Sequence, residues 1–237
     1  MRAAAHLAWV ITSVMVAQAR ADDAGARERD VAIEEELEAL RAEVVALRAM
    51  ARESQAYIAL NNLQRTYGYY VDKGLWDEAA ELFAPDGTLE IAGRGVYIGR
   101  ERVREYLHKL PPYQDGTLFN HMQLQPVIHI DMPAGTAKGR WRTFIQLGFI
   151  GGAARWGEAV YENEYVLVEG TWMIARLHGF ITYYTEFDQG WNKGGVALLR
   201  TVDGLQPDQP PSIEYEAFPK AFIPPFHYPN PVSGKPW

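Results

Sequence analysis

The chain has 237 residues, 48% of them hydrophobic, so it can bury the core of one domain with extensions, and disorder along its whole length is excluded. Its formal net charge is −7. This charge argues against a protein that binds nucleic acid, because phosphate contacts need clustered Lys and Arg. The absence of cysteine excludes disulfides, thiolate nucleophiles and cysteine-based zinc sites.

Residues 1–21 have the pattern of a secretory signal peptide. Arg2 gives a positive start, residues 3–17 are almost wholly apolar, and Ala19-Arg20-Ala21 forms a small-residue cleavage site. An uncleaved membrane anchor is the alternative, but the about 15 apolar residues fall short of the roughly 20 that a spanning helix needs. We therefore expect a protein exported to a bacterial periplasm, with no membrane insertion after cleavage.

Residues 22–53 are predicted to form a helical extension. Apolar residues recur there at spacings of three and four, which is the pattern of a heptad seam: Ile33, Leu37, Leu40, Val44, Leu47 and Ala51. The seam covers fewer than three heptads, so two interpretations stay open. In the first, the helix forms a coiled coil. In the second, it packs on the domain or on a partner subunit. The expected partner is the chain itself, in a homodimer or, if the seam extends the assembly, a homotrimer.

Three helices are predicted next. The first covers 54–70, with Ile58, Leu63 and Tyr70 on its inward face, and ends before Gly74; the second covers 75–84. A turn at 85–88 leads into a hairpin around Gly93-Arg94-Gly95. The third helix covers 100–110 and ends at Pro111, because proline cannot continue a helix.

The remainder of the domain is predicted to be β-structure. Four stretches alternate or run apolar between turn signals, and they cover residues 120–131, 137–150, 156–169 and 171–184. Helices followed by a long antiparallel sheet predict an α+β domain with the helices on one face. Residues 185–237 differ, since nine of the fourteen prolines follow Leu205. We expect an extended arm there, lying on the domain or on a neighbour, with a disordered tail as the alternative.

Two linked patterns carry a family resemblance. D-x-x-x-W-D-x-x-x-x-x-F-A-x-D-G begins at Asp72, and G-x-x-x-G-R-E-x-V-R begins at Gly95. With the strands that follow, residues 54–184 resemble SnoaL-like domains of the nuclear-transport-factor-2-like (NTF2-like) superfamily. The resemblance implies a cone-shaped, strongly curved antiparallel sheet wrapped around three helices, with a deep apolar pocket at its open end. The superfamily includes dehydratases, isomerases, cyclases, epoxide hydrolases and non-catalytic binding proteins, so the fold alone selects no function.

The chain is also similar to scytalone-dehydratase-like members of that superfamily. Their aspartate at the end of the first helix orients a catalytic histidine, and Asp72 matches that aspartate. His121 lies in the strand where such members place a pocket histidine, which makes it the candidate general base or acid. Their tyrosine directly before the aspartate is not matched, because residue 71 is Val. Tyr70 is therefore the catalytic tyrosine candidate, and Tyr69 a substrate-binding one.

Strand alternation supplies further candidates. Trp172 and Ile174 are expected to face inward, and Arg176 and His178 follow them at two-residue spacing on the same face of the strand. His178 is therefore a third catalytic candidate and Arg176 a substrate-binding one. By the same argument His121, Gln123 and Gln125 form one polar row. Trp76, Asn120 and Arg142 complete the substrate-binding set.

The direction of the charged rows on two central strands stays open. Arg140 and Arg142 are expected on one face of their strand. Three glutamates of the next strand are likewise expected to share a face: Glu158, Glu162 and Glu164. An internal row could bind a phenolate or alkoxide, whereas an external row forms ordinary cross-strand ion pairs. We expect the external arrangement, with Arg142 as the exception.

No metal-ligand motif, phosphate loop or serine nucleophile motif is visible, so neither a metal nor a cofactor is expected. The remaining chemistry is a cofactor-independent lyase that uses general acid–base catalysis on a hydroxylated aromatic or polycyclic small molecule. The family resemblance implies either dehydration or a retro-aldol-type loss of formaldehyde, the second known for lignin-derived diaryl compounds. A non-catalytic periplasmic small-molecule-binding or oligomeric scaffold module of the same fold is the alternative.

Overall fold

The computed structural model of the chain describes residues 2–237, with individual side chains described throughout 29–237 and at a few earlier positions. Almost all side chains of the predicted signal peptide, residues 1–21, lie outside the described ones. Within the described part of the chain, none of the helices combines the length and apolar character needed to cross a membrane. The chain divides into two compact units, Met1–Arg52 and Glu53–Trp237, which are described separately below.

The helix α1 runs without interruption over Arg2–Asp72. The sequence predicted a boundary between residues 53 and 54, but no glycine or proline occurs between Gly25 and Gly68, so nothing ends the helix there. In the first unit the predicted seam is exposed to solvent, with Leu37, Leu40 and Leu47 between 43% and 55% accessible. In the second unit α1 ends at Asp72, two residues before Gly74, whose φ is +63°.

The buried face of the last turns of α1 is only partly the predicted one, because Leu63 and Tyr70 are half-buried against the core while other residues form its centre. Its buried positions follow at spacings of four, four, three and four: Ala56, Leu60, Gln64, Tyr67 and Val71. Ile58, expected inside, is 59% exposed. The prediction placed only apolar residues inside, whereas Gln64 is buried because both ends of its amide have partners. It donates to Gln123 at 3.0 Å and accepts from Asn163 and Tyr165 at 2.9 Å.

The short elements after α1 follow the predicted order. They are α2 (Trp76–Glu81), β1 (Phe83–Ile91), β2 (Val96–Ile98) and α3 (Arg100–Leu107). β1 begins at Phe83 and therefore takes in the predicted turn at 85–88. Its pairing is irregular between Phe83 and Thr88, so the Pro85–Gly87 stretch bends the strand without ending it.

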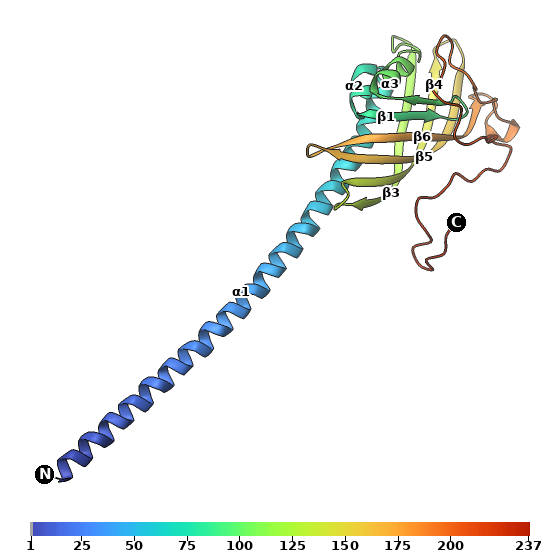
Figure 1. The fold of residues 1–237 in the computed structure, drawn as a ribbon. Coiled ribbons are helices and arrows are strands. Elements are labelled where there is room, and N and C mark those ends of the chain that lie inside the picture. The colour runs from blue at the N-terminus through green and yellow to red at the C-terminus, as the bar shows by residue number, and fades with distance from the viewer. Residues whose placement is uncertain (1) are drawn as a thin grey trace. The chain divides into compact units, whose positions relative to one another are not determined.

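The sheet has six strands in the order β2-β1-β6-β5-β4-β3 and curves strongly (Figure 1). The four long strands are β3 (Thr117–Asp131), β4 (Thr136–Phe149), β5 (Ala154–Val168) and β6 (Thr171–Glu186), joined as an antiparallel meander. β1 pairs with β6 in parallel, so the sheet is mixed and the prediction of an antiparallel sheet was wrong at this pair. Between β1 and β6 the chain forms β2, α3 and the strands β3 to β5, and a connection of this length allows parallel neighbours.

The residues after β6 hold only one short helical turn, η1 (Trp191–Lys193), and lie against the sheet. Gln209 accepts a hydrogen bond from the backbone of Val96, and Phe218 donates one to Thr182 at 2.8 Å. Tyr215 is buried and stacks on Phe222 with ring centroids 4.4 Å apart. This C-terminal segment is therefore an extended arm on its own domain.

Candidate active site

A cavity of about 280 Å³ lies between the end of α1, α2, α3 and the sheet. Its wall is mostly apolar and aromatic, and includes Trp76, Phe119, Ile145, Phe149 and Ile181. Ligand sites in proteins typically occupy about 300–1,000 Å³. The cavity volume falls just below that range, which suits a ligand of one or two rings better than the polycyclic molecule included in the sequence prediction.

Asp72 and His121 form a hydrogen-bonded pair at the edge of this cavity. Asp72, the last residue of α1, accepts from the backbone N–H of His121 at 2.6 Å and from its ring Nδ1 at 3.2 Å. The two side chains are only 12% and 16% exposed. Because a carboxylate can only accept, Nδ1 donates the proton of this hydrogen bond, and Nε2 is the ring nitrogen left for a ligand. His121 lines the cavity, and Asp72 lies behind it.

A glycine allows α1 to approach β3 closely enough for this pair to form. A Cβ at Gly68 would lie 2.8 Å from the carbonyl oxygen of His121 and 2.9 Å from Cγ of Gln123. Any side chain at this position would push the helix away from the strand. Gly68 thus sets the distance between Asp72 and the backbone of His121.

Four tyrosines, Tyr67, Tyr106, Tyr161 and Tyr184, also line the cavity. Burial raises the pKa of Tyr67, Tyr161 and Tyr184, so their hydroxyls stay protonated at neutral pH and can donate hydrogen bonds. Sequence reasoning missed this cluster. The signal was the four-residue spacing of Tyr67 and Val71, which places both on one helix face.

The tyrosines predicted for the site lie elsewhere. Tyr69 is 70% exposed, and Tyr70 is half-buried against the core and does not line the cavity. Each helical residue turns the side chain by about 100°, so Tyr69 points away from the direction of Tyr67. Tyr70 lies about 60° from that direction and packs against the core beside the cavity. Tyr69 and Asn120 instead line a second pocket of about 260 Å³, which Asp72 and His121 also line. Asn120 itself donates to Gln146 at 3.0 Å.

Arg94, in the turn between β1 and β2, was not predicted as a site residue. It is half-buried and lines the cavity, where Nη1 donates to the Tyr106 hydroxyl at 2.5 Å. Its interaction with Tyr106 raises the pKa of Arg94, so the guanidinium stays charged. A hairpin turn flanked by glycines gives no sequence signal for the direction of its side chain, so only the fold could place Arg94 here.

A model of the SnoaL-like domain matches residues 52–178. The chain belongs to the SnoaL-like domain family. No curated protein sequence matches it.

Solved structures share the fold of this SnoaL-like domain. A scytalone dehydratase-like protein from Novosphingobium aromaticivorans DSM 12444 is 18% identical with a TM-score of 0.51, over 66% of this chain and 99% of that one. The hexachlorocyclohexane dehydrochlorinase LinA-type3 from Novosphingobium barchaimii LL02 is 21% identical with a TM-score of 0.51, over 57% and 92%. At these identities the likeness shows the NTF2-like α+β fold, whose distant relatives include dehydratases and dehydrochlorinases.

His178 and Arg176 lie outside the cavity of the SnoaL-like domain, contrary to the prediction. The β5–β6 register shifts between Glu164 and Tyr165, which pair with Arg176 and Ile174, so β6 contains one extra residue. This bulge reverses the alternation, and Leu177 joins Ile174 in the core while His178 turns to the opposite face.

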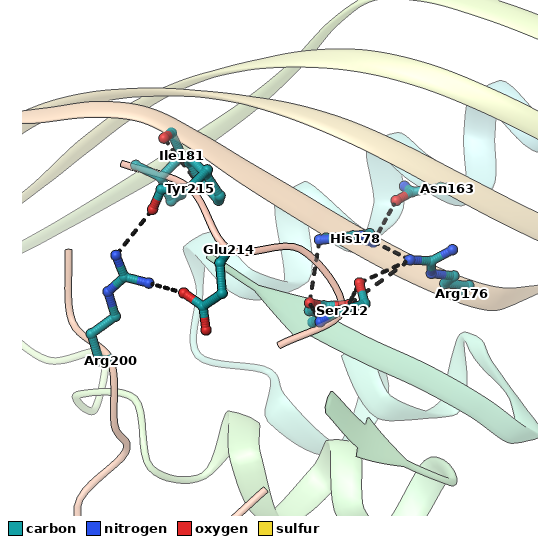
Figure 2. A network of polar contacts seen from close by, with 9 residues as sticks. Asn163, Arg176, His178, Ile181, Arg200, Ser212, Glu214 and Tyr215 are labelled. Carbon is teal, nitrogen blue, oxygen red and sulfur yellow. Dashed lines mark hydrogen bonds and ion pairs between the residues drawn. The ribbon is translucent and has the colours of Figure 1, made fainter. Parts of the chain in front are cut away.

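On that opposite face the C-terminal arm covers His178 (Figure 2). His178 is 2% exposed and its Nδ1 faces Arg176 Nη2 at 2.9 Å. Burial and the Arg176 guanidinium lower the pKa of His178 to about 3, so the ring is neutral. The buried carboxylate of Glu90 beside it accepts from the backbone N–H and the hydroxyl of Ser212, both at 2.7 Å. This cluster attaches the arm to the sheet and is closed to a ligand.

The charged rows on β4 and β5 also face outward, so the prediction for Arg142 was wrong. Arg142 is exposed and pairs with Glu158 at 2.7 Å and with Gln125 at 2.8 Å. Arg140 pairs with Glu162 beneath the arm. The predicted polar row on β3 is interrupted, because the register shifts between Leu124 and Val127 and Gln125 has a φ of +49°.

The described residues contain no group of three or more His, Asp or Glu side chains that could hold a metal ion. Of the residues predicted for the site, His121 and Trp76 line the cavity, and Asp72 supports His121.

Proposed function

We propose that this SnoaL-like domain is a cofactor-independent lyase that acts on a small hydroxylated aromatic compound. The observation that carries the proposal is the Asp72–His121 pair, with the histidine at the wall of an apolar cavity. An apolar wall binds a flat ring, and a histidine oriented by a carboxylate is a common general acid or base in enzymes.

In the proposed reaction His121 Nε2 removes a proton from the substrate carbon next to the one that bears a hydroxyl. The C–H electron pair forms the new C=C bond, the C–O bond breaks, and the hydroxyl leaves as water after taking a proton from the imidazolium. Asp72 stabilises the imidazolium between these steps. A proton transfer of this kind contributes roughly 10²–10⁴-fold to the rate.

Loss of formaldehyde is the second outcome that the same groups could produce. His121 would then remove the proton of a primary alcohol, the adjacent C–C bond would break, and its electron pair would displace a leaving group on the next carbon. Tyrosine hydroxyls such as that of Tyr67 would hydrogen-bond the departing oxygen in either reaction.

The test is turnover by the purified full chain, with a chelator present, on a panel of hydroxylated one-ring and two-ring aromatic compounds. Absorbance follows new conjugation, and a formaldehyde assay runs in parallel. Conjugation that is lost in His121→Ala and kept in His129→Ala supports the lyase. His129 is a matched control, because it lies on the same strand but is exposed and contacts His227. Ligand binding without any turnover would instead favour the non-catalytic binding module.

We further propose that residues 22–53 mediate self-association into a dimer or trimer. The supporting observation is the exposed seam of Leu37, Leu40, Val44 and Leu47 on a continuous helix. Light scattering should show a lower mass for Leu40→Glu than for the unchanged chain. An equal mass at the same concentration would contradict the proposal.

Export to a periplasm also stays a proposal, supported by the apolar stretch 3–17 and the Ala19-Arg20-Ala21 site. Mass spectrometry of the protein recovered from bacterial cells tests it. A mature N-terminus at Asp22 in the periplasmic fraction is expected, and an intact N-terminus in the cytosol would contradict it.

A further inference from the structure

The charge of Arg94 lacks a counter-charge within the domain. None of the ion pairs among the described residues includes Arg94, and its Nε is buried without any hydrogen-bond partner. Within the described part of the chain, its side chain donates a hydrogen bond to the hydroxyl of Tyr106. Burying a cation without an anion is costly, and proteins normally pair such groups.

The other arginine of the cavity shows the usual arrangement. Arg155 lines the same cavity, but its Nε pairs with the carboxylate of Glu186 at 3.1 Å. On the outer face, Arg140 and Arg142 likewise pair with Glu162 and Glu158. Arg94 therefore stands out as a cavity-lining cation that the protein leaves uncompensated.

The carboxylate of Asp72, at the cavity edge, is already committed to His121. Asp72 uses one carboxylate oxygen for both the backbone and the ring of His121. The neighbours of Arg94 are tyrosines: Tyr106, Tyr184 and Tyr97 all interact with its charge. These hydroxyls can donate hydrogen bonds, and burial raises the pKa of Tyr97 and Tyr184, so these two supply no anion at neutral pH.

We propose that Arg94 binds an anionic oxygen of the ligand, and that the ligand class of this cavity is a small aromatic carboxylate. A guanidinium binds a carboxylate through paired N–H donors, and tyrosine hydroxyls around it add further donors. The apolar wall would hold the ring. The inference names the substrate class of the proposed lyase, but the binding step that it describes does not require turnover.

Matched probes test this inference on the full chain at pH 7. The probes are 3-phenylpropanoate and 3-phenylpropanamide, which have the same shape and differ in charge. Titration calorimetry should show the carboxylate binding about 10- to 100-fold more tightly than the amide, which is the usual value of a charge-assisted pair. Arg94→Gln should abolish this preference by weakening carboxylate binding, with amide binding nearly unchanged.

Two further variants separate charge recognition from misfolding. Arg142→Gln removes an exposed arginine of the outer face and should keep the full preference. Arg94→Lys keeps the charge without the fork of donors and should keep part of it. Circular dichroism and melting curves check that each variant is folded.

Three results would overturn the inference: equal affinity of the unchanged protein for both probes, a preference that survives in folded Arg94→Gln, or no binding of either probe. The first and third need no variant. Failure of the lyase proposal is distinguishable, because His121→Ala should lose turnover while its preference for the carboxylate remains. An Arg94-dependent preference without any turnover would leave the anion subsite standing and refute the lyase.

Discussion

One carboxylate oxygen of Asp72 accepts two hydrogen bonds from His121, from the backbone N–H at 2.6 Å and from the ring Nδ1 at 3.2 Å. The shared oxygen links the end of α1 to β3 and fixes both the position of the strand and the orientation of the ring. A single residue thus serves the fold and the proposed chemistry.

Asp72→Asn should separate these two roles. The amide oxygen can still accept from the backbone of His121, but the charge that stabilises the imidazolium is lost. We expect kcat to fall by about 10²–10⁴-fold while the melting temperature changes little. Asp77→Asn is the matched control, because Asp77 pairs with His108 at 3.1 Å on the exposed surface. A kcat unchanged by Asp72→Asn would show that this carboxylate takes no part in the reaction.

Tyr67→Phe tests the tyrosine that the structure places in the cavity. Tyr67 lines the cavity, so its hydroxyl can donate a hydrogen bond to a ligand. Loss of one such bond, worth about 1 kcal/mol, should raise the Kd or KM about five-fold. Tyr57→Phe, on an exposed face of the same helix, is the control and should bind as before. Equal effects of the two changes would argue against a ligand contact.

Gly68→Ala should weaken both stability and the Asp72–His121 pair. The added methyl group would meet the His121 carbonyl at 2.8 Å, and overpacking of this kind costs about 1–3 kcal/mol. Urea unfolding measures the loss. Gly152→Ala is the control, because a Cβ there would meet its nearest neighbour, Cβ of Phe149, at an ordinary 3.4 Å. An unchanged unfolding midpoint for Gly68→Ala would mean that α1 does not press on β3.

His178 should make the protein less stable in acid. The folded pKa is about 3 and the ordinary value is 6.5, so between these values only the unfolded chain takes up the proton. The stability that depends on the neutral ring is complete above pH 6.5 and declines as the pH falls toward 3. From pH 7.5 to pH 5 this group should cost at most about 2 kcal/mol.

Two charged groups act on the His178 ring in opposite directions. Arg176 disfavours the imidazolium, whereas Glu90, with its carboxylate 3.5 Å from Nε2, favours it. Denaturant unfolding across this pH range should show a smaller acid-induced loss for His178→Gln than for the unchanged protein. Identical slopes of stability against pH would show that His178 does not titrate in this way.

The sequence alone predicted much of this architecture, because the signals are local. Gly74 follows the end of α1, Pro111 prevents α3 from continuing, and the turn residues separate four long strands in the right order. The patterns that begin at Asp72 and Gly95 were enough to indicate the SnoaL-like fold. The position of His121 on the strand beside Asp72 followed from the same resemblance.

The tertiary structure decided which side chains face the cavity. One extra residue in β6 reversed the alternation and moved His178 beneath the C-terminal arm, and a strand pattern cannot reveal such a bulge. The helix face was set by Gln64, a polar residue that is buried because distant partners satisfy its amide. Arg94 enters the cavity only because the β1–β2 hairpin packs beside α3. Local preferences determine which elements form, but the direction of a side chain depends on pairings between segments far apart in the chain.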